Sequence, residues 1–226
     1  CFLNPGKTID FNGTKVTYPE VRLVMWAGGN PFAHQPDTMK LERAWKKPET
    51  VVVTDTVWTA TARHADIVLP AATVFEHNDI TNIGTYSNDG LVAMQQAIEP
   101  QWESKPDYWI FSELAKRMGL EAAYTEGLDE MGWIKRLYGE SQKMGERIGV
   151  KLPAFEEFWK KGYFLFDVAE KDRNFVAYEA FRKDPEKNKL KTASGKIEIY
   201  SNKIASYKYD DCPAHPTWME PDEWLG

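Results

Sequence analysis

The sequence contains only two cysteines among its 226 residues, Cys1 and Cys212, which lie at opposite ends of the chain. Two thiols cannot build a disulfide framework, and they cannot supply the ligand set of a cysteine-bound zinc or iron–sulfur site. This scarcity excludes both classes of protein. It leaves open only a single bridge between the two ends.

Basic residues are too few to make the chain positive. The 28 Lys and Arg are outnumbered by 34 Asp and Glu, which gives a formal net charge of −6. Nucleic acids and anionic membrane surfaces require a basic face. Apolar stretches such as residues 21–29, with Arg22 inside, are far shorter than the roughly 20 residues of a membrane-spanning helix. We therefore expect no nucleic-acid partner and no membrane insertion.

Motifs that identify catalytic or metal sites are missing as well. The sequence has no G-x-G-x-x-G or G-x-x-x-x-G-K-[ST] motif and no H-E-x-x-H motif. His34 and His77 each lie near carboxylates, but neither has the spacing of a metal-ligand set, and exposed loop positions are the ordinary alternative. No Ser-His-Asp or Cys-His arrangement is indicated. From the residues alone we expect neither a metal site nor a catalytic residue.

The sequence does contain enough apolar material for a packed core, with 42% hydrophobic and 13% aromatic residues. Its patterns predict strands at 21–26, 50–55 and 66–70, separated by helices at 37–47 and 58–65. Alternation of this kind is typical of βαβ units and a parallel sheet. We therefore predict an α/β fold with a doubly wound, mostly parallel sheet flanked by helices, similar to a Rossmann fold.

The patterns change outside this region. Asn12-Gly13 between two alternating segments predicts a hairpin within residues 7–18. Later patterns predict a strand at 91–98, helices at 104–118, 128–148 and 155–161, and a strand at about 195–200. We divide the chain into a turn-rich lead-in (1–19), a Rossmann-like dinucleotide-binding domain (20–150) and a helical and irregular C-terminal extension (151–226).

The carboxyl ends of the first two predicted strands carry residues suited to a ligand. Gly28, Gly29 and Asn30 follow the first strand. Thr54 and Asp55 end the second. In open parallel sheets ligands bind beyond these ends, where glycines let a phosphate approach backbone N–H groups and a carboxylate accepts from a ribose hydroxyl or a guanine. The alternatives are structural, with Gly28-Gly29 as a tight turn and Asp55 as a turn or capping carboxylate.

Asp107 also has two interpretations. In Ser104-x-x-Asp107 the carboxylate is placed to cap the start of the helix predicted at 104–118. Alternatively, the segment that enters this helix lies over a ligand. The local sequence leaves both interpretations open, and they are compatible.

Three segments together resemble a known family. They are residues 26–32 (Trp-Ala-Gly-Gly-Asn-Pro-Phe), residues 58–70 (Trp-Thr-Ala-Thr-Ala-Arg-His-Ala-Asp-Ile-Val-Leu-Pro) followed by 76–80 (Glu-His-Asn-Asp-Ile), and residues 192–201 (Thr-Ala-Ser-Gly-Lys-Ile-Glu-Ile-Tyr-Ser). The chain closely resembles the molybdopterin oxidoreductases of the dimethyl sulfoxide reductase family, in the branch of trimethylamine N-oxide, dimethyl sulfoxide and biotin sulfoxide reductases. Family members are several times longer, which implies an internal cofactor-binding fragment.

The resemblance implies a bis(molybdopterin guanine dinucleotide)molybdenum cofactor in the full-length protein, with this chain binding one guanine dinucleotide. The matching positions are Gly28, Gly29, Asn30, His34, Thr54, Asp55, His77 and Asp107. The two glycines, Asn30 and His34 would meet the pyrophosphate and nucleoside, and Thr54 and Asp55 the sugar or guanine. His77 stands where the family usually has Arg or Lys, and a neutral imidazole attracts a pyrophosphate less than a cation does.

The implied reaction of the full-length protein is the two-electron reduction of trimethylamine N-oxide, dimethyl sulfoxide or biotin sulfoxide by oxygen-atom transfer. Its implied partners are the small-molecule S-oxide or N-oxide, the remaining domains of the same polypeptide and an electron-donating cytochrome. The implied location is periplasmic, or cytoplasmic for the biotin sulfoxide reductase type. The alternatives are a free-standing, non-catalytic nucleotide-binding module and an interaction domain that keeps only the fold.

Overall fold

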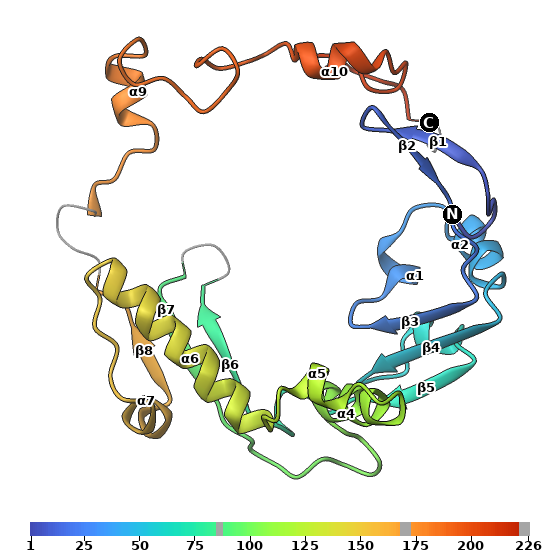
Figure 1. The fold of residues 1–226 in the computed structure, drawn as a ribbon, viewed down its shortest axis with the longest axis vertical. Helices are drawn as coiled ribbons and strands as arrows, with labels where there is room; N and C mark the ends of the chain where they lie inside the picture. The colour runs from blue at the N-terminus through green and yellow to red at the C-terminus, as the bar shows by residue number, and fades with distance from the viewer. Residues whose placement is uncertain (85–87, 168–172, 222–226) are drawn as a thin grey trace. The chain divides into compact units, whose positions relative to one another are not determined.

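The computed structural model describes residues 1–84, 88–167 and 173–221. Contacts between residues divide the chain into two compact units, both traced in Figure 1. The main unit consists of Phe2 and Glu20–Asp167. The terminal unit combines Cys1 and Leu3–Pro19 with the described residues from the C-terminal part of the chain. Each unit is described by itself.

A three-stranded parallel sheet forms the first part of the main unit (Figure 1). Its strands, in spatial order, are β3 (Leu23–Ala27), β4 (Thr50–Asp55) and β5 (Ile67–Pro70). The connecting helices are α1 (Pro31–His34) and α2 (Thr38–Trp45) between β3 and β4, and α3 (Ala60–Arg63) between β4 and β5. Ala27 pairs with Thr54, and Asp55 pairs with Pro70. The carboxyl ends of all three strands therefore lie at one edge of the sheet.

The core of this sheet is built from alternate residues of its strands. Val51 and Val53 of β4 are 2% and 0% exposed, and they pack with Val24, Phe32 and Trp45 in one apolar cluster. The rings of Phe32 and Trp45 meet edge to face, with their centroids 5.5 Å apart. Because side chains alternate along a strand, this cluster fixes the short helices on one face of the sheet.

The second sheet of the main unit is antiparallel. Its strands, in spatial order, are β6 (Asp79–Ile83), β7 (Gly90–Met94) and β8 (Tyr163–Leu165). The long helix α6 (Glu130–Arg147) and the short helix α7 (Phe155–Lys161) pack against this region. Tyr138 and Phe158, one from each helix, are fully buried and stack with ring centroids 4.4 Å apart. Leu91 of β7 joins the same apolar cluster.

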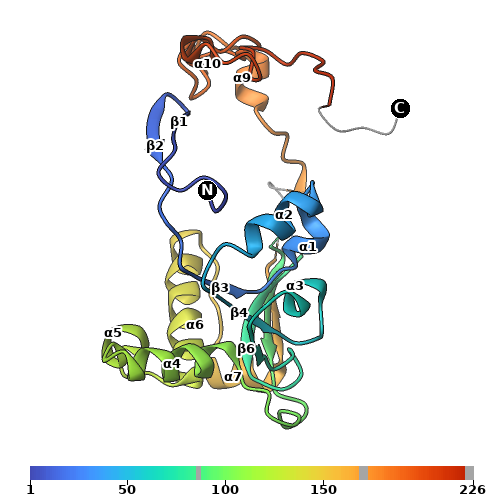
Figure 2. The same cartoon turned by 90° about the vertical axis from the view of Figure 1, so that its right-hand side faces the viewer.

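Two further helices follow β7 in the sequence and precede α6. Helices α4 (Asp107–Arg117) and α5 (Glu121–Thr125) lie side by side (Figure 2). Just after β5, Ala71 forms a parallel bridge with Lys105, which precedes α4. This bridge fixes the start of α4 near the carboxyl end of β5.

The terminal unit contains a hairpin and two short helices. The strands are β1 (Thr8–Phe11) and β2 (Thr14–Thr17), and the helices are α9 (Glu179–Lys183) and α10 (Asn202–Tyr207). Asn12 and Gly13 make the turn with positive φ angles, as an Asn-Gly hairpin requires. The Gly13 N–H donates to the Tyr209 hydroxyl at 2.8 Å, and this hydroxyl donates to Asp10. These bonds hold the hairpin to the C-terminal part of the unit.

The mixed α/β class predicted from the sequence is confirmed, and so is the parallel pairing of the strands expected at 21–26, 50–55 and 66–70. The expectation of mostly parallel pairing is wrong for the described residues, because the β1–β2, β6–β7 and β7–β8 pairs are all antiparallel. Strand β6 escaped prediction because its sequence, Asp-Ile-Thr-Asn-Ile, is short and largely polar.

The strand predicted at 195–200 is also wrong. These residues form bends and irregular backbone, and Ile197 and Ile199 are 71% and 76% exposed. Within the described ranges no strand pairs with them, so the backbone groups of an extended segment would find no ladder partners. The main unit continues to Asp167, beyond the break expected at residue 150, because β8 pairs with β7.

The structure bears on two expectations from the composition, the absence of a membrane-spanning helix and a bridge between Cys1 and Cys212. In the part of the chain that the structure covers, no helix combines the length and apolar character needed to cross a bilayer. Cys1 and Cys212 both belong to the terminal unit, and both are exposed free thiols. The single bridge that the sequence left open is therefore not formed.

Tyr138 provides a test of the core around α6. Its hydroxyl donates to the Pro153 carbonyl at 3.0 Å, and burial raises the pKa of the phenol to about 12. In the unfolded chain this pKa lies near 10, so the folded state holds the proton more tightly. The stability that this difference contributes is fully present below pH 10 and is lost as the pH rises through 12.

We expect Tyr138→Phe to unfold at slightly lower urea concentration at pH 7, by about 1 kcal/mol for the lost hydrogen bond. Between pH 10 and about 12 the variant should lose less stability than the parent chain. Tyr163→Phe is the matched control, because Tyr163 is 45% exposed. If both variants follow the parent's pH dependence, the burial of the Tyr138 phenol does not govern it.

Candidate functional site

The turn after β3 exposes a row of backbone donors. Gly28 and Gly29 have φ angles of +74° and +76°, a region that favours glycine, and both residues are exposed. A Cβ built on either glycine would meet nothing within 4 Å. Glycine is therefore favoured here by the backbone conformation and not by a lack of space. Among the described residues, the N–H groups of Gly28, Gly29 and Asn30 donate no hydrogen bond. The turn therefore offers three consecutive N–H groups to a ligand.

The side chain of Asn30 fixes this turn to α3. Its Oδ1 accepts from the Thr61 hydroxyl at 2.5 Å and from the Thr61 N–H at 3.3 Å. The Thr61 hydroxyl in turn accepts from the Phe32 N–H at 3.4 Å. Asn30 thus uses its oxygen for the fold, and within the described residues its Nδ2 has no partner. The amide nitrogen is the part of Asn30 available to a ligand.

Thr54 and Asp55 stand beside this turn because β4 pairs with β3. The Asp55 carboxylate accepts from the Thr56 N–H and from the Thr59 hydroxyl, both at 2.8 Å. Thr59 is the N-cap of α3, so the interpretation of Asp55 as a turn carboxylate is confirmed. The Thr54 hydroxyl is buried and has no hydrogen-bond partner in the described structure. A buried unpaired hydroxyl at a strand end is a polar group that a ligand atom would satisfy.

Asp107 is the first residue of α4, but it does not cap the helix by a hydrogen bond. The N-cap is Pro106, and no side chain makes the capping bond. Ser104, the other half of the proposed motif, donates its hydroxyl to the Gln101 carbonyl at 2.7 Å instead. Among the described residues the Asp107 carboxylate has no hydrogen bond or ion pair, although its place in the first turn suits the helix dipole. The carboxylate is therefore available to a ligand.

The two histidines differ in their surroundings. His34 is the last residue of α1, exposed and only four residues after Asn30. His77 is half-buried just before β6, and its Nδ1 lies 3.0 Å from the Asn78 carbonyl oxygen. Asn78 itself donates its N–H to Glu130 of α6. The described hydrogen bond of His77 is thus to its neighbour in the sequence, and Asn78 is the residue that bonds to α6.

The structure therefore gathers most of the predicted site at one edge. The turn at residues 28–30 and the end of β4 are neighbours through the pairing of Ala27 with Thr54. The segment that carries Asp107 reaches the same edge through β5, where the Lys105 N–H donates to the Pro70 carbonyl at 3.1 Å.

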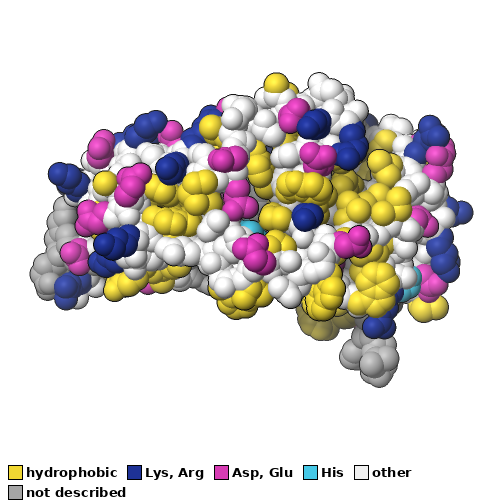
Figure 3. All heavy atoms as spheres, turned by 90° about the horizontal axis from the view of Figure 1, so that it is seen from below, with side chains coloured by type: hydrophobic (Ala, Val, Ile, Leu, Met, Phe, Trp, Pro, Cys, Tyr) yellow, Lys and Arg dark blue, Asp and Glu magenta, His cyan; other side chains and the backbone are white. Residues whose placement is uncertain are grey.

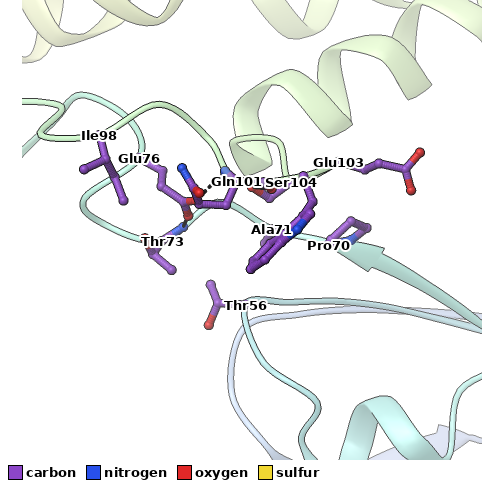
Figure 4. Close-up of a pocket in the computed structure, with 10 residues that line it drawn as sticks. Thr56, Pro70, Ala71, Thr73, Glu76, Ile98, Gln101, Glu103 and Ser104 are labelled. Atoms are coloured by element: carbon purple, nitrogen blue, oxygen red, sulfur yellow. Dashed lines mark hydrogen bonds between the residues drawn. The ribbon is translucent and has the colours of Figure 1, made fainter.

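A cavity of about 500 Å³ does open at this edge, between the residues after β5 and those before α4 (Figure 4). Glu76 organises this cavity, is only 4% exposed, and is not among the residues predicted for the site. Its two carboxylate oxygens accept from the N–H groups of Thr73 and Gln101, each at 2.7 Å. These backbone bonds hold the pKa of Glu76 below its ordinary value. No local sequence signal announces this role, because the two partners are backbone groups 28 residues apart.

The arrangement favours binding over proton transfer. It offers backbone N–H donors, an amide nitrogen, a hydroxyl and the carboxylate of Asp107, which suit the phosphates, hydroxyls and base of a nucleotide. Within the described ranges, no three His, Cys, Asp or Glu side chains come together to hold a metal ion.

Comparisons with known proteins bear on this site. The family model described as molybdopterin oxidoreductase matches residues 4–117. The dimethyl sulfoxide/trimethylamine N-oxide reductase of Cereibacter sphaeroides is 54% identical over 99% of this chain, and the trimethylamine-N-oxide reductase of Haemophilus influenzae is 48% identical over 99%. Among solved structures, acetylene hydratase from Pelobacter acetylenicus matches with a TM-score of 0.56 at 24% identity, over 90% of this chain and 24% of that chain. The last match is a likeness of fold.

The chain therefore belongs to the molybdopterin oxidoreductase family, as the resemblance of its three segments predicts. Of the two relatives named above, the first is a dimethyl sulfoxide/trimethylamine N-oxide reductase and the second a trimethylamine-N-oxide reductase. The chain spans only 27% of the length of each. The roles of individual residues toward a cofactor stay predictions.

The hydrogen bonds of Thr61 fix the turn after β3, and a substitution of Thr61 tests their contribution to stability. Its side chain is fully buried and bonds both Asn30 and the Phe32 N–H. Thr61→Val keeps the volume but removes the hydroxyl, and we expect it to lower the free energy of unfolding by about 1–3 kcal/mol. Urea unfolding of the chain measures this. Thr56→Val is the control, since Thr56 is exposed and should change stability by less than about 0.5 kcal/mol. Equal effects of the two substitutions would contradict the claim that the hydrogen bonds of Thr61 stabilise this turn.

Proposed function

We propose that this chain is the cofactor-binding part of a molybdenum-dependent S-oxide or N-oxide reductase. The full-length protein would carry out the two-electron reduction of trimethylamine N-oxide, dimethyl sulfoxide or biotin sulfoxide, and this chain would bind one molybdopterin guanine dinucleotide of its cofactor. Family membership and the names of the relatives support the reaction. The observation that carries the binding role is the row of three unbonded N–H groups at residues 28–30.

The residues at the strand ends fit a guanine dinucleotide. The N–H groups of residues 28–30 would donate to the pyrophosphate, which needs donors but not a net positive chain. The buried hydroxyl of Thr54 would gain the partner that it lacks within the protein. Asp55 would bind the sugar or guanine with lone pairs left over from its bonds to Thr56 and Thr59.

The other predicted contacts fit to different degrees. The Asp107 carboxylate has no partner of its own and would accept from the N–H groups of a guanine. His34 is exposed near the turn after β3, where it would reach the same nucleotide. His77 is the weakest of these proposals, because its one described hydrogen bond is to the neighbouring Asn78 and a neutral imidazole attracts a pyrophosphate less than a cation does.

These groups favour a role for this chain in binding the cofactor, while the cofactor itself would supply the chemistry. When bound, the molybdenum cofactor supplies oxygen-atom transfer, with two electrons delivered to the S–O or N–O bond of the substrate. The residues of this chain hold and orient the nucleotide end. The described groups at the edge of the parallel sheet are suited to binding, so we propose no catalytic residue in this chain.

We propose that the parallel sheet is part of a larger, doubly wound sheet completed by the remaining domains of the same polypeptide. Leu23 and Ile67 pair with Thr50 and Val52, opposite the apolar cluster, and they are 60% and 48% exposed. Hydrophobic side chains also gather on the face shown in Figure 3. Exposed apolar patches of this kind mark surfaces that other protein segments cover.

The remaining partners and the location follow from the same proposal. An N-oxide or S-oxide reductase needs a source of two electrons, for which we propose a cytochrome donor. We propose a periplasmic location, with a cytoplasmic one for the biotin sulfoxide reductase type. Expression of the full-length gene with a C-terminal tag, followed by cell fractionation, decides between them.

Asp107→Ala tests the binding role in the full-length gene product. A hydrogen bond to a charged group contributes about 1.5–3 kcal/mol, so we expect the cofactor to be lost at least about tenfold faster. The measurement is molybdenum and guanine nucleotide per polypeptide, followed over time after gel filtration. Glu121→Ala is the control, because Glu121 begins the neighbouring helix α5 and has no proposed contact. Unchanged cofactor retention in Asp107→Ala would refute the assigned contact.

A further inference from the structure

Glu76 connects two loops that are distant in sequence. Its Oε2 accepts from the Thr73 N–H and its Oε1 from the Gln101 N–H, each at 2.7 Å, and the side chain is 4% exposed. Figure 4 shows the carboxylate between these two residues at the wall of the cavity. A buried carboxylate that accepts two backbone N–H groups is held firmly, because charge-assisted bonds are roughly twice as strong as neutral ones.

The loop that Glu76 holds leads directly into α4. The Phe75 carbonyl accepts from the N–H groups of Ala97 and Ile98, at 2.9 and 3.1 Å. Glu76 then binds Gln101, and the Gln101 carbonyl accepts both the N–H and the hydroxyl of Ser104. Residues 97, 98 and 101 are thus bonded to Phe75 and Glu76, and Ser104 is bonded to Gln101.

The end of the same segment is bonded to the parallel sheet. The Lys105 N–H donates to the Pro70 carbonyl at 3.1 Å, and the Lys105 carbonyl accepts from the Ala72 N–H at 2.8 Å. Asp107 follows two residues later, as the first residue of α4. The segment is therefore fixed near both of its ends, by Glu76 at one and by the sheet at the other.

The Asp107 carboxylate has no bond of its own within the described residues. Its position is set only by the backbone that carries it, and this backbone is held by the bonds described above. A displacement of the backbone at residues 101–105 would therefore also displace the Asp107 carboxylate. A contact that binds a ligand depends on placement within a fraction of an ångström, so the support is as important as the contact.

We infer that Glu76 is a positioning residue, which holds Asp107 in place for the nucleotide end of the cofactor through the segment at residues 101–105. The inference rests on the proposed function, in which Asp107 contacts the nucleotide. Glu76 itself need not touch the nucleotide. It acts through two backbone N–H groups, one of them on the segment that carries Asp107 toward the site.

The decisive variant is Glu76→Gln in the full-length gene product. Glutamine keeps the size but replaces one acceptor oxygen with an NH₂ group, so either the Thr73 or the Gln101 N–H loses its partner. We expect the cofactor to be lost about tenfold faster, measured as molybdenum and guanine nucleotide per polypeptide over time. Glu99→Gln is the matched control, since Glu99 lies on the same loop and is exposed. It should retain cofactor as the parent does.

A double-mutant cycle separates positioning from general stability. If Glu76 acts through Asp107, then Glu76→Gln combined with Asp107→Ala loses cofactor no faster than Asp107→Ala alone. Combined with Asp55→Ala, at the other strand end, the two effects should multiply. If Glu76→Gln instead multiplies the loss caused by Asp107→Ala, Glu76 has only a structural role and the inference is overturned.

A milder variant covers the case in which Glu76→Gln does not fold. Ser104→Ala removes the hydroxyl bond to the Gln101 carbonyl in the same segment, and we expect about a two- to threefold faster loss of cofactor, again absent on the Asp107→Ala background.

The outcomes also distinguish a failure of the proposed function from a failure of the inference. If Asp107→Ala itself retains cofactor, the assigned contact and the inference fail together. If Asp107→Ala loses cofactor while Glu76→Gln and Ser104→Ala retain it, only the inference fails.

Discussion

The parallel pairing of β3 with β4 is the constraint on which the candidate site depends. It places Ala27 opposite Thr54, so the glycine turn after one strand and the carboxylate at the end of the next come to the same edge. An antiparallel pairing would have sent these two ends to opposite edges of the sheet. The apolar cluster around Val53 fixes the pairing, because a shift of one residue would turn its buried side chains toward the other face.

The polar groups at this edge are divided between holding the fold and facing outward. Side-chain oxygens of Asn30 and Asp55 accept hydrogen bonds from Thr61 of α3 and from its N-cap Thr59, and these bonds fix the turn and the strand end in place. The N–H groups of the glycine turn have no partners in the described structure. The same residues thus make the site rigid and keep its donors available, which is what binding an anionic group requires.

Part of this architecture could be predicted from the sequence alone. Short apolar runs predicted the three parallel strands, because residues buried on a sheet must be apolar whatever their partners. The Asn-Gly hairpin and α7 also follow from local chemistry, and the bounds of α7 agree with the prediction. The strand expected at 195–200 failed because alternation shows only that a segment can be a strand, and a neighbour must supply the hydrogen bonds.

The sequence by itself determined the family and the residue types at the strand ends, since motifs and local periodicity are properties of neighbouring residues. Only the tertiary structure decided which of these residues meet. It left the Asp107 carboxylate without a capping bond, and it placed the buried Glu76 carboxylate between two backbone N–H groups, which no local pattern indicates. The physical reason is that Glu76 bonds backbone N–H groups, which every residue except proline carries, so nothing in the sequence marks its partners.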